Sequence, residues 1–212
     1  MVYQVAMENV TIVEGSSDSA IADWLAVQLG RSLDACEGLV PITVPGGSTP
    51  FPIMEALLEH DLDWTRLVVW PGDDRMVPED HVASNTGKLR DMFEPAGADV
   101  VTLTETLPVP HFALAWLGMG ADGHIASLFP NTDPQIGEPR KVVRLTPDPL
   151  PEEAPFDRIS LTIPALLASD GIVFVIRGDE KRAVFDQAVA GKSDLPVARL
   201  LAAARQPVTC FI

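Results

Sequence analysis

The chain has 212 residues, a length that favours one large domain over two small ones. Hydrophobic residues make up 47% of the sequence and charged residues 21%, the balance of an ordinary globular protein, which excludes an intrinsically disordered chain. Asp and Glu number 30 against 15 Lys and Arg, for a formal net charge of −15, and a field of that sign repels nucleic acids and anionic membranes. A small anionic substrate would need a local concentration of arginines or backbone amides.

The apolar runs and the cysteines of the sequence indicate the cellular compartment of the protein. The longest apolar runs, such as residues 171–176, are far shorter than the roughly 20 residues that span a membrane. The first eight residues contain no basic segment followed by an apolar one, so no signal peptide is predicted. Cys36 and Cys210 cannot make a disulfide framework, and we expect both to be reduced core thiols. These features predict a cytoplasmic protein without a membrane partner.

Strand-like and helix-like apolar periods alternate along the chain. Helical spacing begins after Ser17 or Asp18, either of which can act as the cap. In chain order we predict a helix at 18–34, a strand at 38–44, a helix at 50–59, a strand at 66–70, a helix at 84–93, strands at 112–117, 158–163 and 171–176, helices from 178 to about 190 and at 197–204, and a strand at 208–212. The fold class predicted is α/β, with a mostly parallel sheet covered by helices on both faces.

A Pro-rich segment at 147–155 has the composition of a linker or of an exposed loop. Predicted apolar strands lie close to this segment in the sequence. We therefore expect a surface excursion within a single domain of residues 1–212, and no domain boundary.

The first strand–helix connection reads Pro45-Gly46-Gly47-Ser48-Thr49-Pro50. Two glycines let the backbone approach a ligand closely, Ser48 or Thr49 can cap the next helix, and Pro50 suits its first position. Amides at a helix N-terminus attract anions, so the turn is either a phosphate site or an ordinary, well-capped connection. Ligands of open α/β sheets gather beyond the carboxyl ends of strands, which favours the site.

The second connection contains Asp73, Asp74 and Arg75 directly after a predicted strand. Two carboxylates and a guanidinium at a strand end can hold sugar hydroxyls and a phosphate. The alternative is a loop that neutralises itself, with Asp73 or Asp74 paired to Arg75. Further on, His81 is expected to be structural, and Ser84-Asn85 is expected to cap a helix.

The third connection is Gly118-Met-Gly-Ala-Asp122-Gly123-His124-Ile-Ala-Ser-Leu-Phe-Pro130. Its glycines place His124 on a tight turn with open backbone around it. A histidine there can act as a general base near neutral pH, and Asp122 is close enough in sequence to orient the imidazole. The alternative is a turn histidine at a helix start. Three such turns at strand ends favour one common site.

Together these segments resemble the 6-phosphogluconolactonase family. Its members carry a Gly-Gly-Ser-Thr-Pro turn, an Asp-Glu-Arg turn followed by Val-Pro and Ser-Asn, and a Gly-x-Gly-x-Asp-Gly-His-x-Ala-Ser-Leu-Phe-Pro stretch, which here are residues 46–50, 73–85 and 118–130. The similarity continues through 158–162 and 178–181 and spans about two thirds of the chain. Asp74 replaces the family's usual Glu, Ile125 replaces a frequent Thr, and Phe156-Asp157 stand where prolines are common.

Related families leave alternatives open. Glucosamine-6-phosphate deaminase shares Gly-Ser-Thr-Pro and Gly-His-Ile with this chain. However, it carries Asn-Gly-His and Phe-Asn-Glu-Pro where this chain has Asp122-Gly123-His124 and Ser127-Leu128-Phe129-Pro130. That difference favours the lactonase over the deaminase or another phosphosugar isomerase. A sugar-phosphate-sensing regulator domain is the non-catalytic alternative, although the sequence has no helix-turn-helix extension and no basic patch.

The resemblance implies a cytosolic enzyme of the oxidative pentose phosphate pathway, with a modified Rossmann-like α/β sandwich fold. It would hydrolyse a small sugar-phosphate lactone, 6-phospho-D-glucono-1,5-lactone, without a metal or another cofactor, as a monomer or small homo-oligomer. The catalytic candidates implied are His124 as general base, Asp122 and Asp73. The substrate and phosphate candidates are Gly46, Gly47, Ser48, Thr49, Arg75, Gly123 and Arg158.

Overall fold

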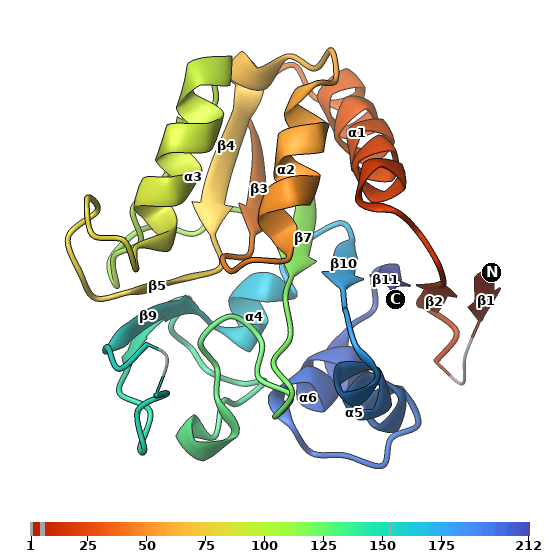
Figure 1. The fold of residues 1–212 in the computed structure, drawn as a ribbon, viewed down its shortest axis with the longest axis vertical. Coiled ribbons are helices and arrows are strands. Elements are labelled where there is room, and N and C mark those ends of the chain that lie inside the picture. Colours follow the sequence, from red (N-terminus) through yellow and green to blue (C-terminus); the bar gives the residue numbers. More distant parts are fainter. Residues whose placement is uncertain (1, 5–6, 153) are drawn as a thin grey trace.

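Eight strands form one sheet within residues 2–4, 7–152 and 154–212, the part of the chain that the computed structural model describes (Figure 1). They lie in the order β1 (Val2–Gln4), β2 (Val10–Val13), β11 (Val208–Phe211), β10 (Ile172–Val175), β7 (Leu114–Leu117), β3 (Val40–Val44), β4 (Leu67–Pro71) and β6 (Asp99–Val100). All neighbours are parallel except β1 and β2, which pair antiparallel. The predicted, mostly parallel sheet is confirmed.

Helices cover both faces of this sheet, as predicted (Figure 1). One face carries α1 (Asp18–Ala35), α2 (Pro50–Leu58) and α3 (Asn85–Phe93). The other carries α4 (Ile163–Leu166), α5 (Asp179–Val189), α6 (Pro196–Ala203) and a small antiparallel sheet of β5 (Asp73–Arg75), β9 (Arg158–Leu161) and β8 (Val142–Leu145). Three short 3-10 turns complete the described elements: η1 (Trp64–Arg66), η2 (Glu94–Ala96) and η3 (Pro130–Thr132).

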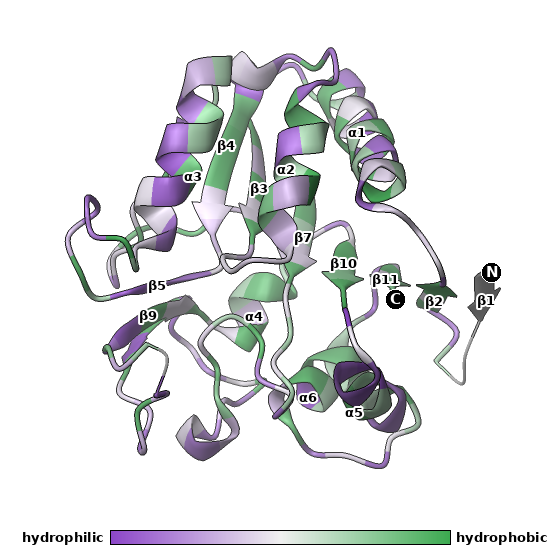
Figure 2. Cartoon of the chain, viewed as in Figure 1, coloured by the Kyte–Doolittle hydropathy of each residue, from purple (hydrophilic) through white to green (hydrophobic). Residues whose placement is uncertain are grey.

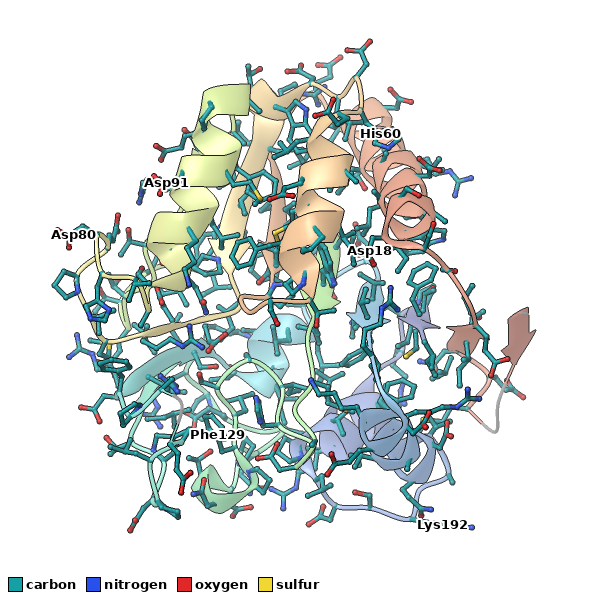
Figure 3. The ribbon with its side chains drawn as sticks, in the orientation of Figure 1. Asp18, His60, Asp80, Asp91, Phe129 and Lys192 are labelled. Carbon is teal, nitrogen blue, oxygen red and sulfur yellow. The ribbon has the colours of Figure 1, made fainter. Side chains whose placement is uncertain are left out.

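Strand β10 explains why the sheet has two apolar faces. Val173 and Val175 belong to the cluster that packs against α1, α2 and α3, whereas Ile172 and Phe174 belong to the cluster on the side of α5 and α6. Successive side chains of a strand point to opposite faces, so a continuous apolar run feeds both layers. Strand β10 is accordingly green, the colour of hydrophobic residues, in Figure 2, while charged side chains such as Asp80 and Asp91 lie at the outer edge (Figure 3).

Helix α1 is closed at both ends by side chains. The Ser17 hydroxyl accepts the backbone N–H of Ala20 at 3.2 Å, which confirms one of the two predicted caps. The last turn of α1 contains no basic residue. Its carbonyls are instead satisfied by Arg66, whose guanidinium donates to the carbonyl oxygens of Leu33, at 3.1 Å, and of Cys36.

The structure corrects several sequence expectations. The strand predicted over 158–163 ends at Leu161, because Ile163 already begins α4. Cys210 is a buried thiol, but Cys36 lies exposed after α1 and is not part of the core. Strands β1, β2, β5, β6 and β8 were not predicted. No helix within the described residues is long and apolar enough to cross a membrane.

Two expectations fall partly on residues that the structure does not describe. Residues 1, 5 and 6 belong to the N-terminal segment in which no signal peptide is predicted, and they lie outside the described residues. The same holds for Glu153 in the Pro-rich segment.

Candidate active site

A cavity of about 360 Å³ opens beyond the carboxyl ends of β3, β4, β7 and β10. Figure 1 labels these four strands. The chain runs from β3 outward to β4 and β6, and then returns to place β7 on the other side of β3. Connections from such neighbouring strands leave in opposite directions, which opens a crevice at this switch point. The cavity is lined by, among others, Gly46, Gly47, Ser48, Thr49, Asp73, Arg75, Asn85, Gly118, Gly120, His124, Ser127, Phe129, Arg158, Arg177 and Lys181.

His124 and Asp122 form a hydrogen-bonded pair in the connection after β7. The imidazole Nδ1 lies 2.6 Å from Asp122 Oδ1, and the backbone N–H of His124 donates to the same oxygen at 3.2 Å. The ring also packs against Phe129, with ring centroids 4.5 Å apart; Phe129 lies in the lower half of Figure 3. An ionised carboxylate at Nδ1 fixes the proton of a neutral ring there, so Nε2 is left as the basic nitrogen.

Charge balance keeps Asp122 ionised. Partial burial acts to raise the pKa of its carboxyl, but the hydrogen bond and the charge attraction from His124 outweigh burial and hold this pKa below its ordinary value. The contact that the sequence spacing could only suggest is therefore formed. This geometry would allow Asp122 to orient the imidazole of His124.

Glycine is required where the turn folds back on this pair. A Cβ on Gly120 would lie 2.2 Å from Nδ1 and Cε1 of His124, and 2.6 Å from Asp122 Oδ1. Gly123 has a φ of +78°, in the left-handed region that favours glycine, and its carbonyl accepts the N–H of Val197 at 3.1 Å. Gly123 therefore ties the turn to the start of α6, although it does not itself line the cavity.

The connection 45–50 wraps closely around the side chain of Asn85. A Cβ on Gly46 would come within 2.1 Å of Asn85 Oδ1, so only glycine allows this approach. Thr49, one of the two predicted cap residues, occupies the N-cap position of α2, but its side chain accepts no helix N–H. Pro50 occupies the first helical position as predicted. Gly46, Gly47, Ser48 and Thr49 all line the cavity.

Arg75 and Arg158 lie directly opposite each other on β5 and β9. Arg75 Nη1 donates to the carbonyl of Ala83 and to Asn85 Oδ1, both at 3.0 Å, and Arg158 Nη2 donates to the carbonyl of Ala154 at 2.8 Å. Within the described residues, Arg75 Nε and Arg158 Nη1 are buried without a hydrogen-bond partner. Burial and the charge of Arg75 lower the pKa of Arg158. Two like charges with unused donors at one cavity wall suit a phosphate group.

The two aspartates of this connection have different surroundings. The buried carboxylate of Asp74 accepts the backbone N–H groups of Arg75, Asn85 and Thr86 at 2.6–2.9 Å and the Ser84 hydroxyl at 3.1 Å. It therefore closes the N-terminus of α3 and does not pair with the Arg75 guanidinium. Asp73 lines the cavity instead, and burial raises the pKa of its carboxyl despite the Ser127 hydrogen bond and the Arg75 charge.

Four cavity residues were missed or left undecided from the sequence. The sequence predicts only a helix cap for Asn85, yet its side chain accepts an N–H of Arg75 and donates to the Asp73 carbonyl at 2.9 Å. Ser127 belongs to the 118–130 stretch that carries the resemblance, but the sequence predicts no separate role for it. Arg177, in the connection after β10, pairs with Asp18 at 3.0 Å and lines the cavity. Lys181, in the first turn of α5, lines it as well.

Other sequence candidates lie outside this cavity. Ser84 caps α3 as expected, accepting the N–H of Gly87 at 3.0 Å. His81 accepts the N–H of Ala83 and packs against Phe156, in keeping with a structural role. Among the side chains that the structure describes, no group of three or more His, Cys, Asp or Glu could hold a metal ion.

Comparison with known proteins finds relatives that are similar to this chain in sequence and in fold. The family model of glucosamine-6-phosphate isomerases/6-phosphogluconolactonase matches residues 16–105 and 94–209. The chain is 35% identical to a 6-phosphogluconolactonase of Neisseria meningitidis over 94% of this chain and 95% of that protein, and 34% identical to one of Pseudomonas aeruginosa over 84% and 83%. The crystal structure of a 6-phosphogluconolactonase from Shewanella baltica is similar, with a TM-score of 0.81 and 26% identity over 97% of this chain and 98% of that one.

Proposed function

The chain belongs to the glucosamine-6-phosphate isomerase/6-phosphogluconolactonase family, and we propose that it is a hydrolase that converts 6-phospho-D-glucono-1,5-lactone to 6-phospho-D-gluconate. The observation that carries this proposal is the hydrogen-bonded His124–Asp122 pair. His124 lines the same cavity as Arg75 and Arg158. The relatives quoted above are named as lactonases, which supports the same reaction.

His124 acts as the general base in this mechanism. Its Nε2 takes a proton from water while the water oxygen forms a bond to the lactone carbonyl carbon. The tetrahedral intermediate then collapses, the bond from that carbon to the ring oxygen breaks, and His124 returns the proton to the leaving ring oxygen. Asp122 stabilises the protonated imidazole between these two steps. The new carboxyl group ionises after release.

The remaining cavity residues bind the substrate. Arg75 and Arg158 each offer an unused N–H to the phosphate, and the 46–49 turn at the start of α2 offers backbone amides. Backbone amides of the connections after β3 and β7, or a nearby arginine, stabilise the oxyanion of the intermediate. The N–H of Gly123 is not one of these donors, because it donates to the Gly120 carbonyl at 3.0 Å. Asp73 remains a second candidate for proton transfer beside this site.

We extend the proposal to the setting of the enzyme. Residues 1–212 form one lactonase domain that acts in the oxidative pentose phosphate pathway in the cytoplasm, as a monomer or small homo-oligomer and without a nucleic-acid partner. The net charge of −15 supports the last point.

The decisive assay is a titration of the acid released from freshly generated 6-phosphogluconolactone, corrected for spontaneous hydrolysis. The protein should accelerate acid release in proportion to its concentration. Ammonia released from glucosamine 6-phosphate would identify a deaminase instead. Binding of sugar phosphates with no turnover of either compound would identify a sensing domain.

Replacing Arg75 should weaken substrate binding. Arg75→Ala removes one of the two opposed guanidinium groups. The free energy of substrate binding should weaken by about 1.5–3 kcal/mol, the range for a hydrogen bond to a charged group, so KM should rise roughly 10- to 150-fold. The measurement is KM together with inhibition by inorganic phosphate. Arg144→Ala is the matched control, because Arg144 lies exposed on β8 of the same small sheet and pairs with Glu105. Normal kinetics in a folded Arg75→Ala protein would make Arg75 structural.

Chelation should leave the rate unchanged. The proposed mechanism needs only side chains, amides and water, so activity should survive exhaustive treatment with a chelator and dialysis. The measurement compares initial rates before and after treatment. A loss that one divalent ion restores specifically would overturn the cofactor-free mechanism.

A further inference from the structure

Ser127 connects two parts of the cavity that come from distant segments of the chain. It lies three residues after His124, is 1% exposed, and lines the cavity. Its hydroxyl donates to Asp73 Oδ2, and its backbone N–H donates to Ser160 Oγ at 3.2 Å. Asp73 and Ser160 are themselves direct partners across β5 and β9. Ser127 therefore binds both members of one cross-strand pair.

That cross-strand pair is next to the two arginines. The register places Arg75 opposite Arg158, two residues further along the same strands. Residues two apart on a strand lie on the same face of the sheet, about 6.6 Å from each other. The contacts of Ser127 thus join the loop of His124 to the sheet face that carries the arginine pair, at a fixed spacing.

The backbone before Ser127 adopts a costly conformation to make these contacts. Ala126 has a φ of +49°, in the left-handed region that residues with a Cβ rarely adopt. Around it the chain turns sharply, with the N–H of Leu128 bonded to the carbonyl of Ile125 at 2.9 Å. Local strain of this kind persists where the surrounding structure fixes it, and it gathers at functional sites.

We propose that Ser127 is a positioning residue that fixes the distance between His124 and the Arg75–Arg158 pair. The inference rests on the proposed function. The substrate carries its phosphate on C6 and its reacting carbonyl at C1, so one end must reach the arginines while the other meets the base. The Ser127 hydrogen bonds fix the distance between the His124 loop and the strands of the two arginines. This distance determines whether the carbonyl of a substrate whose phosphate is bound by the arginines lies within reach of His124.

The test is Ser127→Ala, assayed for kcat, KM and inhibition by inorganic phosphate. We expect kcat on 6-phosphogluconolactone to fall by about tenfold to a hundredfold, the effect of a misplacement of about 1 Å, while phosphate inhibits as strongly as in the wild type. The fall in kcat on 6-phosphogluconolactone should exceed the fall on unphosphorylated D-glucono-1,5-lactone, because the second compound has no phosphate for the arginines to hold. Ser127→Thr, which keeps the hydroxyl, should restore most of kcat.

Ser169→Ala is the matched control. Ser169 is also buried, and its hydroxyl donates to the Leu166 carbonyl at 2.9 Å, but it does not line the cavity. A similar fall in kcat for Ser169→Ala, an equal fall on both lactones, or a wild-type kcat in Ser127→Ala would overturn the inference. If the alanine variant does not fold, Ser127→Cys keeps the volume with only a weak donor and should show the same direction of change. An inactive wild type would overturn the proposed function as well, whereas an active wild type beside an equally active Ser127→Ala overturns this inference alone.

Discussion

His124→Asn should lower kcat by about 10²–10⁴ and leave phosphate binding largely intact. Asparagine keeps a polar side chain of similar reach, but it cannot accept the proton of the attacking water. A general base acts only in its unprotonated form, so the wild-type rate should fall on the acid side of the pH profile. This acid limb should disappear in the variant. The measurement is a pH–rate profile of both proteins, corrected for spontaneous lactone hydrolysis.

A second histidine–aspartate pair provides the control for this experiment. His111 Nε2 lies 2.6 Å from Asp170 Oδ1, the same separation as in the His124–Asp122 pair, but His111 does not line the cavity. His111→Asn should retain the wild-type profile. A folded His124→Asn enzyme with near-normal kcat and an unchanged acid limb would show that the base lies elsewhere, and Asp73 would be the next candidate.

Gly120→Ala should lower kcat by about a hundredfold without changing the residues that carry the chemistry. The added methyl group would lie 2.2 Å from the His124 ring, too close for any real contact, so the imidazole must move. Movement breaks or lengthens the hydrogen bond between Asp122 and Nδ1, and Nε2 then no longer faces the substrate carbonyl. Steady-state kinetics measure the loss, and KM should change much less than kcat.

Gly118→Ala is the companion variant from the same turn. It also lines the cavity, but its Cβ would meet only the Pro45 side chain, at an ordinary contact distance of 3.5 Å. It should keep most of the wild-type kcat. If both variants lose activity equally, or if Gly120→Ala keeps full activity, close packing against His124 is not what the reaction requires of Gly120.

Local signals predict five strands of the larger sheet, β3, β4, β7, β10 and β11, and five helices, α1, α2, α3, α5 and α6. They do not predict β1, β2 or α4. A segment such as 172–175 is apolar throughout, and Ser17 precedes a helical period, so each element can be recognised without its partners. Strand β5 could not, since Asp73-Asp74-Arg75 is polar and becomes a strand only by pairing with β9. The two-residue β6 is likewise too short to carry a pattern.

The candidate site divides in the same way. His124 and Asp122 are two residues apart, so their contact follows from a turn that the glycines already indicate. Asn85 and Ser127 act through partners far away in the sequence, and by themselves they look like a helix cap and a small loop residue. Lys181 and Arg177 are ordinary charged residues near the start of a helix until the fold brings them to the cavity. Only tertiary contacts bring these four residues to the cavity, and a local sequence pattern does not contain those contacts.

The pairing of Arg75 with Arg158 has a consequence for how the protein acquires its activity. These residues are more than eighty positions apart, so the strands that carry them meet only after a long loop closes. Loop closure costs conformational entropy before any contact returns free energy, and a three-residue strand with one like-charged pair returns little by itself. Pairing of β5 with β9 therefore depends on the rest of the fold to bring both segments together. We expect the proposed phosphate-binding pair to be among the first parts of the molecule to be lost as the fold loosens.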